Sequence, residues 1–129
     1  MDLETPLPAL YAGFGCRRGC PVDVLDTLLR QSLDALRGIA TISLKADEPG
    51  LRQLALRHGL ILVVFDASQL QAFEPLLSHR SAPAYAHSGC WGVAESTALA
   101  LASRELGSAR LRVTRQSQGP ATVALAGGG

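Results

Sequence analysis

Residues 9–44 read "ALYAGFGCRRGCPVDVLDTLLRQSLDALRGIATISL", and this stretch predicts the fold. An apolar run at 9–14 ends in glycine and predicts a buried strand. Pro21 suits the first position of a helix, and Gly38 ends the helical pattern. Within that pattern, apolar residues recur at three- and four-residue steps, as on one face of a helix: Val22, Leu25, Leu28, Leu29, Leu33 and Leu36. The apolar run at 39–44 predicts the next strand.

The rest of the chain continues the alternation of strands and helices. "LILVVF" at 60–65 is continuously apolar, which predicts a central strand covered on both faces. The last two strands are separated only by "QSQGP", which is too short for a helical crossover and predicts an antiparallel hairpin. We therefore predict an α/β fold, a three-layer α/β/α sandwich with a mostly parallel five-stranded sheet and a C-terminal antiparallel hairpin. Helices are expected at 51–58, 66–77 and 92–106, strands at 110–115 and 121–126, and an irregular stretch at 78–91.

Length and composition limit the possible classes of protein. The 129 residues fit one domain, which we place at 9–126, between an irregular lead-in at 1–8 and a flexible tail at 127–129. A formal net charge of +1 argues against a general binder of nucleic acids or membrane surfaces. No apolar run reaches the roughly 20 residues of a membrane span, and no signal-peptide pattern opens the chain. Three cysteines are an odd number for a secreted disulfide framework, so a cytoplasmic protein is expected.

The glycine-rich turn "GFGCRRGC" at 13–20 is the main candidate for a binding site. In α/β folds, ligands bind at the carboxyl ends of the parallel strands, where this turn would meet "SLKADEPG" at 43–50. The glycines would let the backbone approach a bound group, and the helix start after them favours an anion. The turn matches neither the dinucleotide fingerprint nor a nucleoside-triphosphate loop. The expected ligand-binding residues are Gly13, Gly15, Cys16, Arg17, Arg18, Gly19, Lys45 and Arg115, the last if its strand runs parallel to the others.

The cysteines leave two further interpretations open. Cys16, Cys20 and Cys90 with His79 or His87 would supply four zinc ligands, but no pair has a familiar zinc spacing. Small, half-buried side chains near a turn are the favoured interpretation, so we predict no metal and no cofactor. A thiol nucleophile at Cys16 is a minor alternative, because neighbouring arginines and a helix N-terminus lower the pKa of a thiol.

Several motifs, in order along the chain, resemble the CobE and CbiG C-terminal domain family of cobalamin biosynthesis. "GFGCRRG" follows the first strand, "TISLKADEPGLRQLA" follows the second, "VAESTALA" opens the late helix and "TVALA" closes the chain. The resemblance covers roughly residues 9 to 126. This sequence departs from the family pattern at Ser43, where an acidic residue is frequent, and at Trp91 and Gly92, where proline and serine are common.

The resemblance implies a role in building the corrin ring. Corrin precursors are broad apolar macrocycles fringed with acetate and propionate carboxylates, which Arg17, Arg18 and Lys45 would contact. A non-catalytic protein that binds or carries such an intermediate, and hands it to other enzymes of the pathway, is the first hypothesis. In the longer CbiG proteins this domain accompanies the hydrolase that opens a lactone on cobalt-precorrin-5A and releases acetaldehyde. The second hypothesis is therefore a hydrolase of a precorrin lactone or related acyl bond, with Lys45, Asp47 or Glu48 taking part.

The absence of a nucleophile–base pair at a recognisable spacing favours the binding hypothesis. A third hypothesis, a nucleotide or phosphate binder of flavodoxin-like shape, is disfavoured because the chain has no standard phosphate-binding loop.

Overall fold

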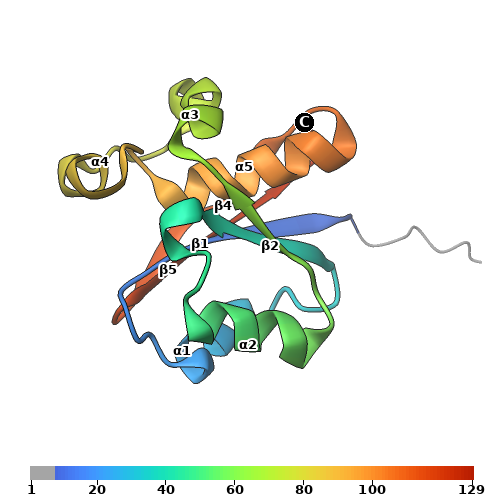
Figure 1. Cartoon of the computed structure of the whole chain (residues 1–129). Coiled ribbons are helices and arrows are strands. Elements are labelled where there is room, and N and C mark those ends of the chain that lie inside the picture. The colour runs from blue at the N-terminus through green and yellow to red at the C-terminus, as the bar shows by residue number, and fades with distance from the viewer. Residues whose placement is uncertain (1–7) are drawn as a thin grey trace, which may run out of the picture.

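A computed structural model describes residues 8–129, so all but the last residue of the predicted lead-in at 1–8 lies outside the described residues (Figure 1). One sheet with strand order β3-β2-β1-β5-β4 forms the centre of the molecule. Its strands are β1 (Leu10–Cys16), β2 (Leu36–Ile42), β3 (Leu62–Phe65), β4 (Arg110–Gln118) and β5 (Ala121–Gly127). The helices are α1 (Val22–Leu29), η1 (Ser43–Lys45), α2 (Pro49–His58), α3 (Ala67–Leu70), η2 (Gln71–Leu76), α4 (Ala82–Ser88) and α5 (Val93–Leu106).

The directions of the strands bring several loops to one edge of the sheet. Strand β1 pairs in parallel with β2, and β2 pairs in parallel with β3. Strand β5 lies antiparallel between β1 and β4, so β4 points in the same direction as β1. The predicted hairpin is confirmed. The sheet is mixed rather than mostly parallel, because β5 inserts beside β1 and contributes both antiparallel pairings.

Helices cover both faces of the sheet, which confirms the three-layer sandwich. Helices α1 and α2 lie on one face, and α5 crosses the other face with α3 beside it (Figure 1). Helix α5 is alanine-rich, and its residues 94–102 are all buried. Small side chains let this helix lie close to the sheet, and it touches strands β1, β2 and β5. The core is therefore two apolar clusters, one on each face of the central strand β1.

The first helix is shorter than its apolar pattern predicts. Helix α1 ends at Leu29, and residues 30–35 form successive turns, with the Ser32 amide donating to the Leu29 carbonyl at 2.8 Å. Leu36 already belongs to β2 and is buried there. The helical spacing misled the prediction because Leu33 and Leu36 reach the same apolar cluster from a turn and from a strand.

The segment 60–65 is an edge strand, so the prediction of a central strand covered on both faces is wrong. Strand β3 has β2 on one side and no strand on the other. Ile61 is 74% exposed and Val64 is 37% exposed. A continuous apolar run fits this position because the strand contacts both core clusters. Phe65 belongs to the cluster on the α5 face of the sheet, Val63 packs against it, and Leu62 packs against the cluster on the face covered by α1 and α2.

Three other segments differ in detail from their sequence-based predictions. The helix expected at 66–77 is divided into α3 and η2, with Pro75 inside η2. The irregular stretch 78–91 contains α4, whose first turn is capped by Ser81 through a 3.2 Å bond from the Ala84 amide. Strand β5 extends to Gly127, which pairs with Arg110. Within residues 8–129, no helix combines the length and the apolar character needed to cross a membrane.

Candidate functional site

The loops after β1 and β2 meet at one edge of the sheet and border a groove of about 640 Å³. Both loops that the sequence singles out contribute to it, and Arg17 and Lys45 line the same space. Helix α4 adds His87 from a distant part of the chain. The groove is lined by Cys16, Arg17, Arg18, Leu44, Lys45, Asp47, Glu48, Pro49 and His87.

A tight turn at 17–20 carries the two arginines. The amide of Arg17 donates to the carbonyl of Pro120 at 2.9 Å, and the amide of Cys20 donates to the carbonyl of Arg17 at 3.1 Å. Gly19 closes the turn with a φ of +78°, a backbone angle that residues other than glycine rarely adopt. This backbone leaves the side chains of Arg17 and Arg18 exposed to solvent.

Glu48 connects the loop after β2 to the turn after β1. Its side chain is only 7% exposed, and its Oε2 accepts the amide of Gly19 at 2.8 Å. The amide that the glycine-rich turn would offer to an anion is thus already bonded to an internal carboxylate. The sequence suggested Glu48 as a catalytic candidate. In the structure, this hydrogen bond gives Glu48 a defined role, which is to hold the turn at 17–20. Its Oε1 has no hydrogen-bond partner among residues 8–129, and Glu48 is one of the residues that line the groove.

The cations of the groove form no direct ion pair within the described residues, although Asp47 and Glu48 line the same groove. Among residues 8–129, Arg17, Arg18 and Lys45 form no ion pair. Asp47, the closest acidic neighbour of Lys45 in sequence, pairs instead with Arg52 at 2.9 Å. Three cations that form no ion pair within residues 8–129 favour an anionic ligand, and the carboxylates of Asp47 and Glu48 at the same groove reduce its positive charge.

Cys16 is not an activated nucleophile. Burial, together with the charges of Glu48 and Cys20, raises the pKa of its thiol to about 12, and the opposing effect of Lys45 is smaller. The thiol is therefore protonated at neutral pH, which contradicts the alternative of a lowered pKa. Across residues 8–129, no three histidine, cysteine or acidic side chains are grouped so that they could hold a metal ion.

Gly13, Gly15 and Arg115 lie outside the groove lining. Gly13 is buried beneath α5, where an added Cβ would lie 2.5 Å from the backbone nitrogen of Ala98. Its role is close packing of a helix on a strand. Gly15 and Arg115 line a neighbouring cavity of about 250 Å³ at the start of α5. Four predicted residues, Cys16, Arg17, Arg18 and Lys45, therefore line the groove, while Gly19 shapes its rim through the turn.

The cavity beside Arg115 is organised by Glu95, a buried carboxylate. Glu95 accepts the amide of Arg115 at 2.9 Å, the amide of Ser78 at 2.8 Å and the hydroxyl of Ser78. Burial raises the pKa of this carboxyl, but hydrogen bonds from Ser78 and from the amides of Arg115, Ser78 and His79 outweigh burial and lower the pKa below its ordinary value. The sequence gives no signal for these contacts, because the partners lie 17 and 20 positions away.

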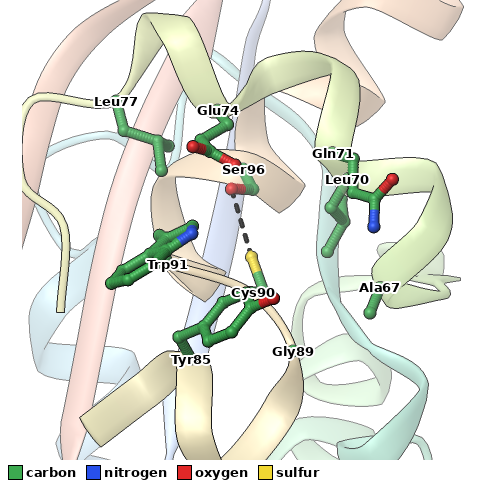
Figure 2. Close-up of a pocket in the computed structure, with 10 residues that line it drawn as sticks. All are labelled: Ala67, Leu70, Gln71, Glu74, Leu77, Tyr85, Gly89, Cys90, Trp91 and Ser96. Atoms are coloured by element: carbon green, nitrogen blue, oxygen red, sulfur yellow. Dashed lines mark hydrogen bonds between the residues drawn. The ribbon is translucent and has the colours of Figure 1, made fainter. Parts of the chain in front are cut away.

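Trp91 belongs to a different cavity, of about 170 Å³, between α3, η2 and α4. Figure 2 shows its ring lying against that of Tyr85, and the two centroids are 4.4 Å apart. Next to them, the thiol of Cys90 points to Ser96, with Sγ 3.3 Å from Oγ. The stacked pair connects α4 to the segment that leads into α5, so Trp91 contributes to the position of α4 rather than to the groove wall.

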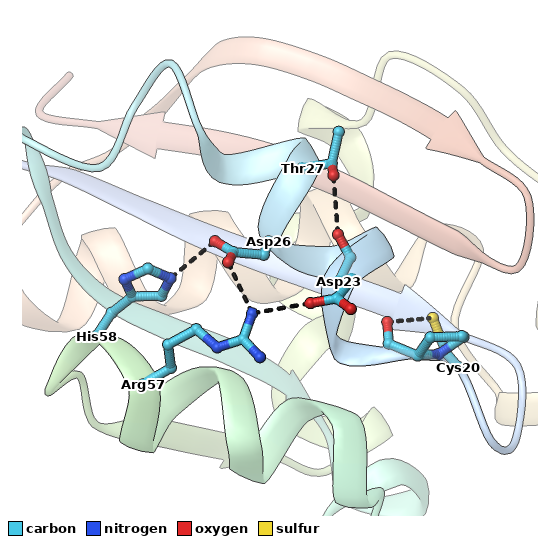
Figure 3. A network of polar contacts seen from close by, with 7 residues as sticks. Cys20, Asp23, Asp26, Thr27, Arg57 and His58 are labelled. Atoms are coloured by element: carbon cyan, nitrogen blue, oxygen red, sulfur yellow. Dashed lines mark hydrogen bonds and ion pairs between the residues drawn. The ribbon is translucent and has the colours of Figure 1, made fainter.

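A polar network joins α1 to α2, the two helices that begin beside the groove. Asp26 accepts from Arg57 at 2.8 Å and contacts Nε2 of His58 at 2.8 Å (Figure 3). Arg57 also reaches Asp23 at 3.1 Å. The hydrogen bond from Arg57 lowers the pKa of Asp26, burial opposes it, and the contact with His58 lowers it further. These contacts fix α1, which follows the turn at 17–20, relative to α2, which follows Glu48.

Comparison with known proteins gives a consistent set of relatives. The family model described as "Cobalamin synthesis G C-terminus" matches residues 10–126. Protein CobE of Sinorhizobium sp is 35% identical over 125 residues, which are 92% of this chain and 79% of that protein. The cobalt-precorrin-5A hydrolase of Priestia megaterium is 25% identical over 91% of this chain, but the match covers only 32% of the hydrolase.

A solved structure is also similar over almost the whole chain. It is the crystal structure of CobE, a protein from the cobalamin (vitamin B12) biosynthetic pathway. The two chains superpose with a TM-score of 0.85 at 41% sequence identity, covering 98% of this chain and 94% of that one.

Proposed function

This chain belongs to the cobalamin synthesis G C-terminus family, and from this premise we propose that it binds or carries a polycarboxylate corrin-ring intermediate without transforming it. The family places the chain in cobalamin biosynthesis. The observation that carries the proposal is the groove of about 640 Å³ in which Arg17, Arg18 and Lys45 form no ion pair among residues 8–129.

The chemistry of the groove agrees with that of such a ligand. Corrin intermediates carry several carboxylates at separate points of an apolar ring, so they need cations from more than one loop. Arginine can bind a carboxylate through two parallel hydrogen bonds, and lysine adds a point charge. The groove supplies both types from two loops whose spacing Glu48 holds through the Gly19 amide.

Absorbance titration of the purified chain with hydrogenobyrinic acid tests the proposal. A saturable spectral shift without product formation is the expected result. The double variant Arg17→Ala/Arg18→Ala should weaken binding by about 1.5–3 kcal/mol for each charged hydrogen bond lost. The matched control is Arg30→Ala/Arg37→Ala, which removes the same charge from exposed positions outside the groove lining. Equal affinities of the two double variants would refute the proposal.

Hydrolysis of a precorrin lactone or related acyl bond is the second candidate function. It is favoured by one observation, the buried carboxylate of Glu48 with its Oε1 unbonded among residues 8–129 and Lys45 in the same groove. The protonated Cys16 thiol supplies no nucleophile. Product formation that is abolished by Lys45→Ala or Glu48→Gln would establish the hydrolase and overturn the carrier role.

Two further features belong to the same proposal. Delivery of a bound intermediate to other enzymes of the pathway would follow from a carrier role. A cytoplasmic location agrees with the state of Cys16, Cys20 and Cys90, which all have free thiols.

A further inference from the structure

We propose that the groove has an apolar side compartment that selects ligands with an uncharged alkyl edge next to their carboxylates. The compartment is a cavity of about 100 Å³ beside the groove. Its apolar walls are formed by Gly15, Cys16, Ile42, Leu44, Ala84 and Val93, and Lys45, His87 and Ser88 complete the lining. This inference rests on the proposed function, because it names the part of a bound polycarboxylate that carries no charge.

The cavity adjoins the groove. Cys16, Leu44, Lys45 and His87 line both of them. Leu44 stands at the junction and is 56% exposed, although it is a large apolar side chain. A ligand whose carboxylates meet the cations of the groove would therefore place the neighbouring part of its ring edge against Leu44 and the cavity mouth.

The inner walls of the cavity are uncharged. Ile42 is buried, and Val93 packs against the α5 core cluster. The thiol of Cys16 is neutral at physiological pH because burial and the charge of Glu48 keep its pKa high. A carboxylate placed against Ile42, Ala84 or Val93 would lose its hydration without gaining a hydrogen-bond donor from their side chains. Lys45, His87 and Ser88 also line the cavity, so it is the part bordered by Ile42, Ala84 and Val93 that is suited to an apolar group.

The volume limits what can enter. An apolar protein cavity of about 150 Å³ holds one benzene molecule. The side cavity, at about 100 Å³, therefore has room for a methyl or small alkyl substituent but not for a ring of a macrocycle. Pockets of this size discriminate between ligands that differ by one methyl or methylene group.

Helix α4 makes this compartment possible. Ala84, His87 and Ser88 belong to its lining, and two contacts with Trp91 hold the helix: the bond from the Ser81 amide to the Trp91 carbonyl at 2.8 Å and the stacking of Tyr85 on the Trp91 ring. Gly15 belongs to the same lining, and its missing side chain leaves the space open. An added Cβ at Gly15 would lie 3.8 Å from Cβ of Val93, an ordinary van der Waals contact, so it would occupy the cavity without a clash.

The test compares two tetrapyrrole polycarboxylates as fluorescent probes. Coproporphyrin carries methyl groups beside its propionates, whereas uroporphyrin has acetates in place of those methyl groups. Ala84→Leu and Gly15→Ala both reduce the space of the cavity, which shares these two residues with the cavity of about 250 Å³ beside Arg115. Ala86→Leu is the matched control, since it makes the same change on the exposed side of α4 outside the cavity lining.

The measured quantity is the ratio of the two affinities, coproporphyrin over uroporphyrin. Both cavity-filling variants should lower this ratio by about fourfold or more, the factor that corresponds to ~0.8 kcal/mol for one excluded methyl group. Ala86→Leu should leave the ratio unchanged. Thermal unfolding verifies that each variant is folded. If Ala84→Leu does not fold, the affinity ratio measured for Gly15→Ala decides the test.

The inference is overturned if the ratio stays at the wild-type value in the folded cavity-filling variants, or if the wild type binds neither porphyrin. The proposed function is judged separately by the hydrogenobyrinic acid titration. Normal binding of hydrogenobyrinic acid with an unchanged porphyrin ratio would remove the side compartment and keep the carrier role.

Discussion

Replacing Gly13 by alanine adds a methyl group where helix α5 crosses strand β1. The new Cβ would lie 2.5 Å from the backbone nitrogen of Ala98, and closer still to the carbonyl oxygen of Ala94 and the hydroxyl of Thr97. Two of these three atoms belong to the backbone and cannot rotate away. The helix must therefore retreat by at least about 1 Å to restore an ordinary separation of about 3.5 Å.

We expect Gly13→Ala to lower the free energy of unfolding by about 3 kcal/mol or more, the upper end of the range for overpacking, because the obstructing atoms are backbone atoms. For a chain of this length that loss corresponds to a fall in Tm of about 10 °C. Denaturant titration and thermal unfolding followed by circular dichroism measure both quantities.

The matched control is Gly15→Ala on the same strand. Its added Cβ would meet only Val93, at 3.8 Å, so the free energy of unfolding should change by less than about 1 kcal/mol. A Gly13→Ala variant as stable as the wild type would refute the close contact of α5 with β1. It would also reopen the prediction that Gly13 serves a ligand.

Three further predictions concern the groove and its supports. Glu48→Ala removes the acceptor of the Gly19 amide and should lower the free energy of unfolding by about 1.5–3 kcal/mol in a denaturant titration. Glu48→Gln keeps an oxygen at that position, so its loss of stability should be less than half as large. Equal losses for the two variants would contradict the hydrogen bond. Asp26 has a pKa held below its ordinary 3.8 by Arg57, so its contribution is present above about pH 4 and is lost as pH falls through the lowered pKa. The stability difference between wild type and Asp26→Asn, about 1 kcal/mol at pH 7, should therefore shrink at pH 3 and below, and a constant difference would exclude the ion pair as its source. The Cys16 thiol, with a pKa of about 12, should react slowly with iodoacetamide at pH 7 and much faster only in strongly alkaline solution. Mass spectrometry measures the extent of alkylation at Cys16. Fast alkylation at pH 7 would contradict the protonated state of the thiol.

The sequence indicated much of the site because the relevant loops directly follow strands. Arg17 and Arg18 follow β1 directly, Lys45 lies in the short helix η1 after β2, and parallel strands that pair with each other end at the same edge. The wall from α4 was not predicted. Residues 78–91 have few apolar residues at helical spacing. The bond from the Ser81 amide to the Trp91 carbonyl and the Tyr85–Trp91 stack hold α4, which brings His87 to the groove that Lys45 also lines.

The alternation of apolar runs, helical patterns and glycine-containing turns was sufficient by itself to determine the α/β class, the C-terminal hairpin and the edge at which the cations gather. The first two features depend on neighbours in the chain, so local patterns encode them, and the third follows because parallel strands that pair with each other end at the same edge. The insertion of β5 beside β1, the edge position of β3 and the bond from Gly19 to Glu48 were decided only by the tertiary structure. Each of them joins segments far apart in the sequence, and an apolar run or a glycine carries no record of which distant atoms will pack against it.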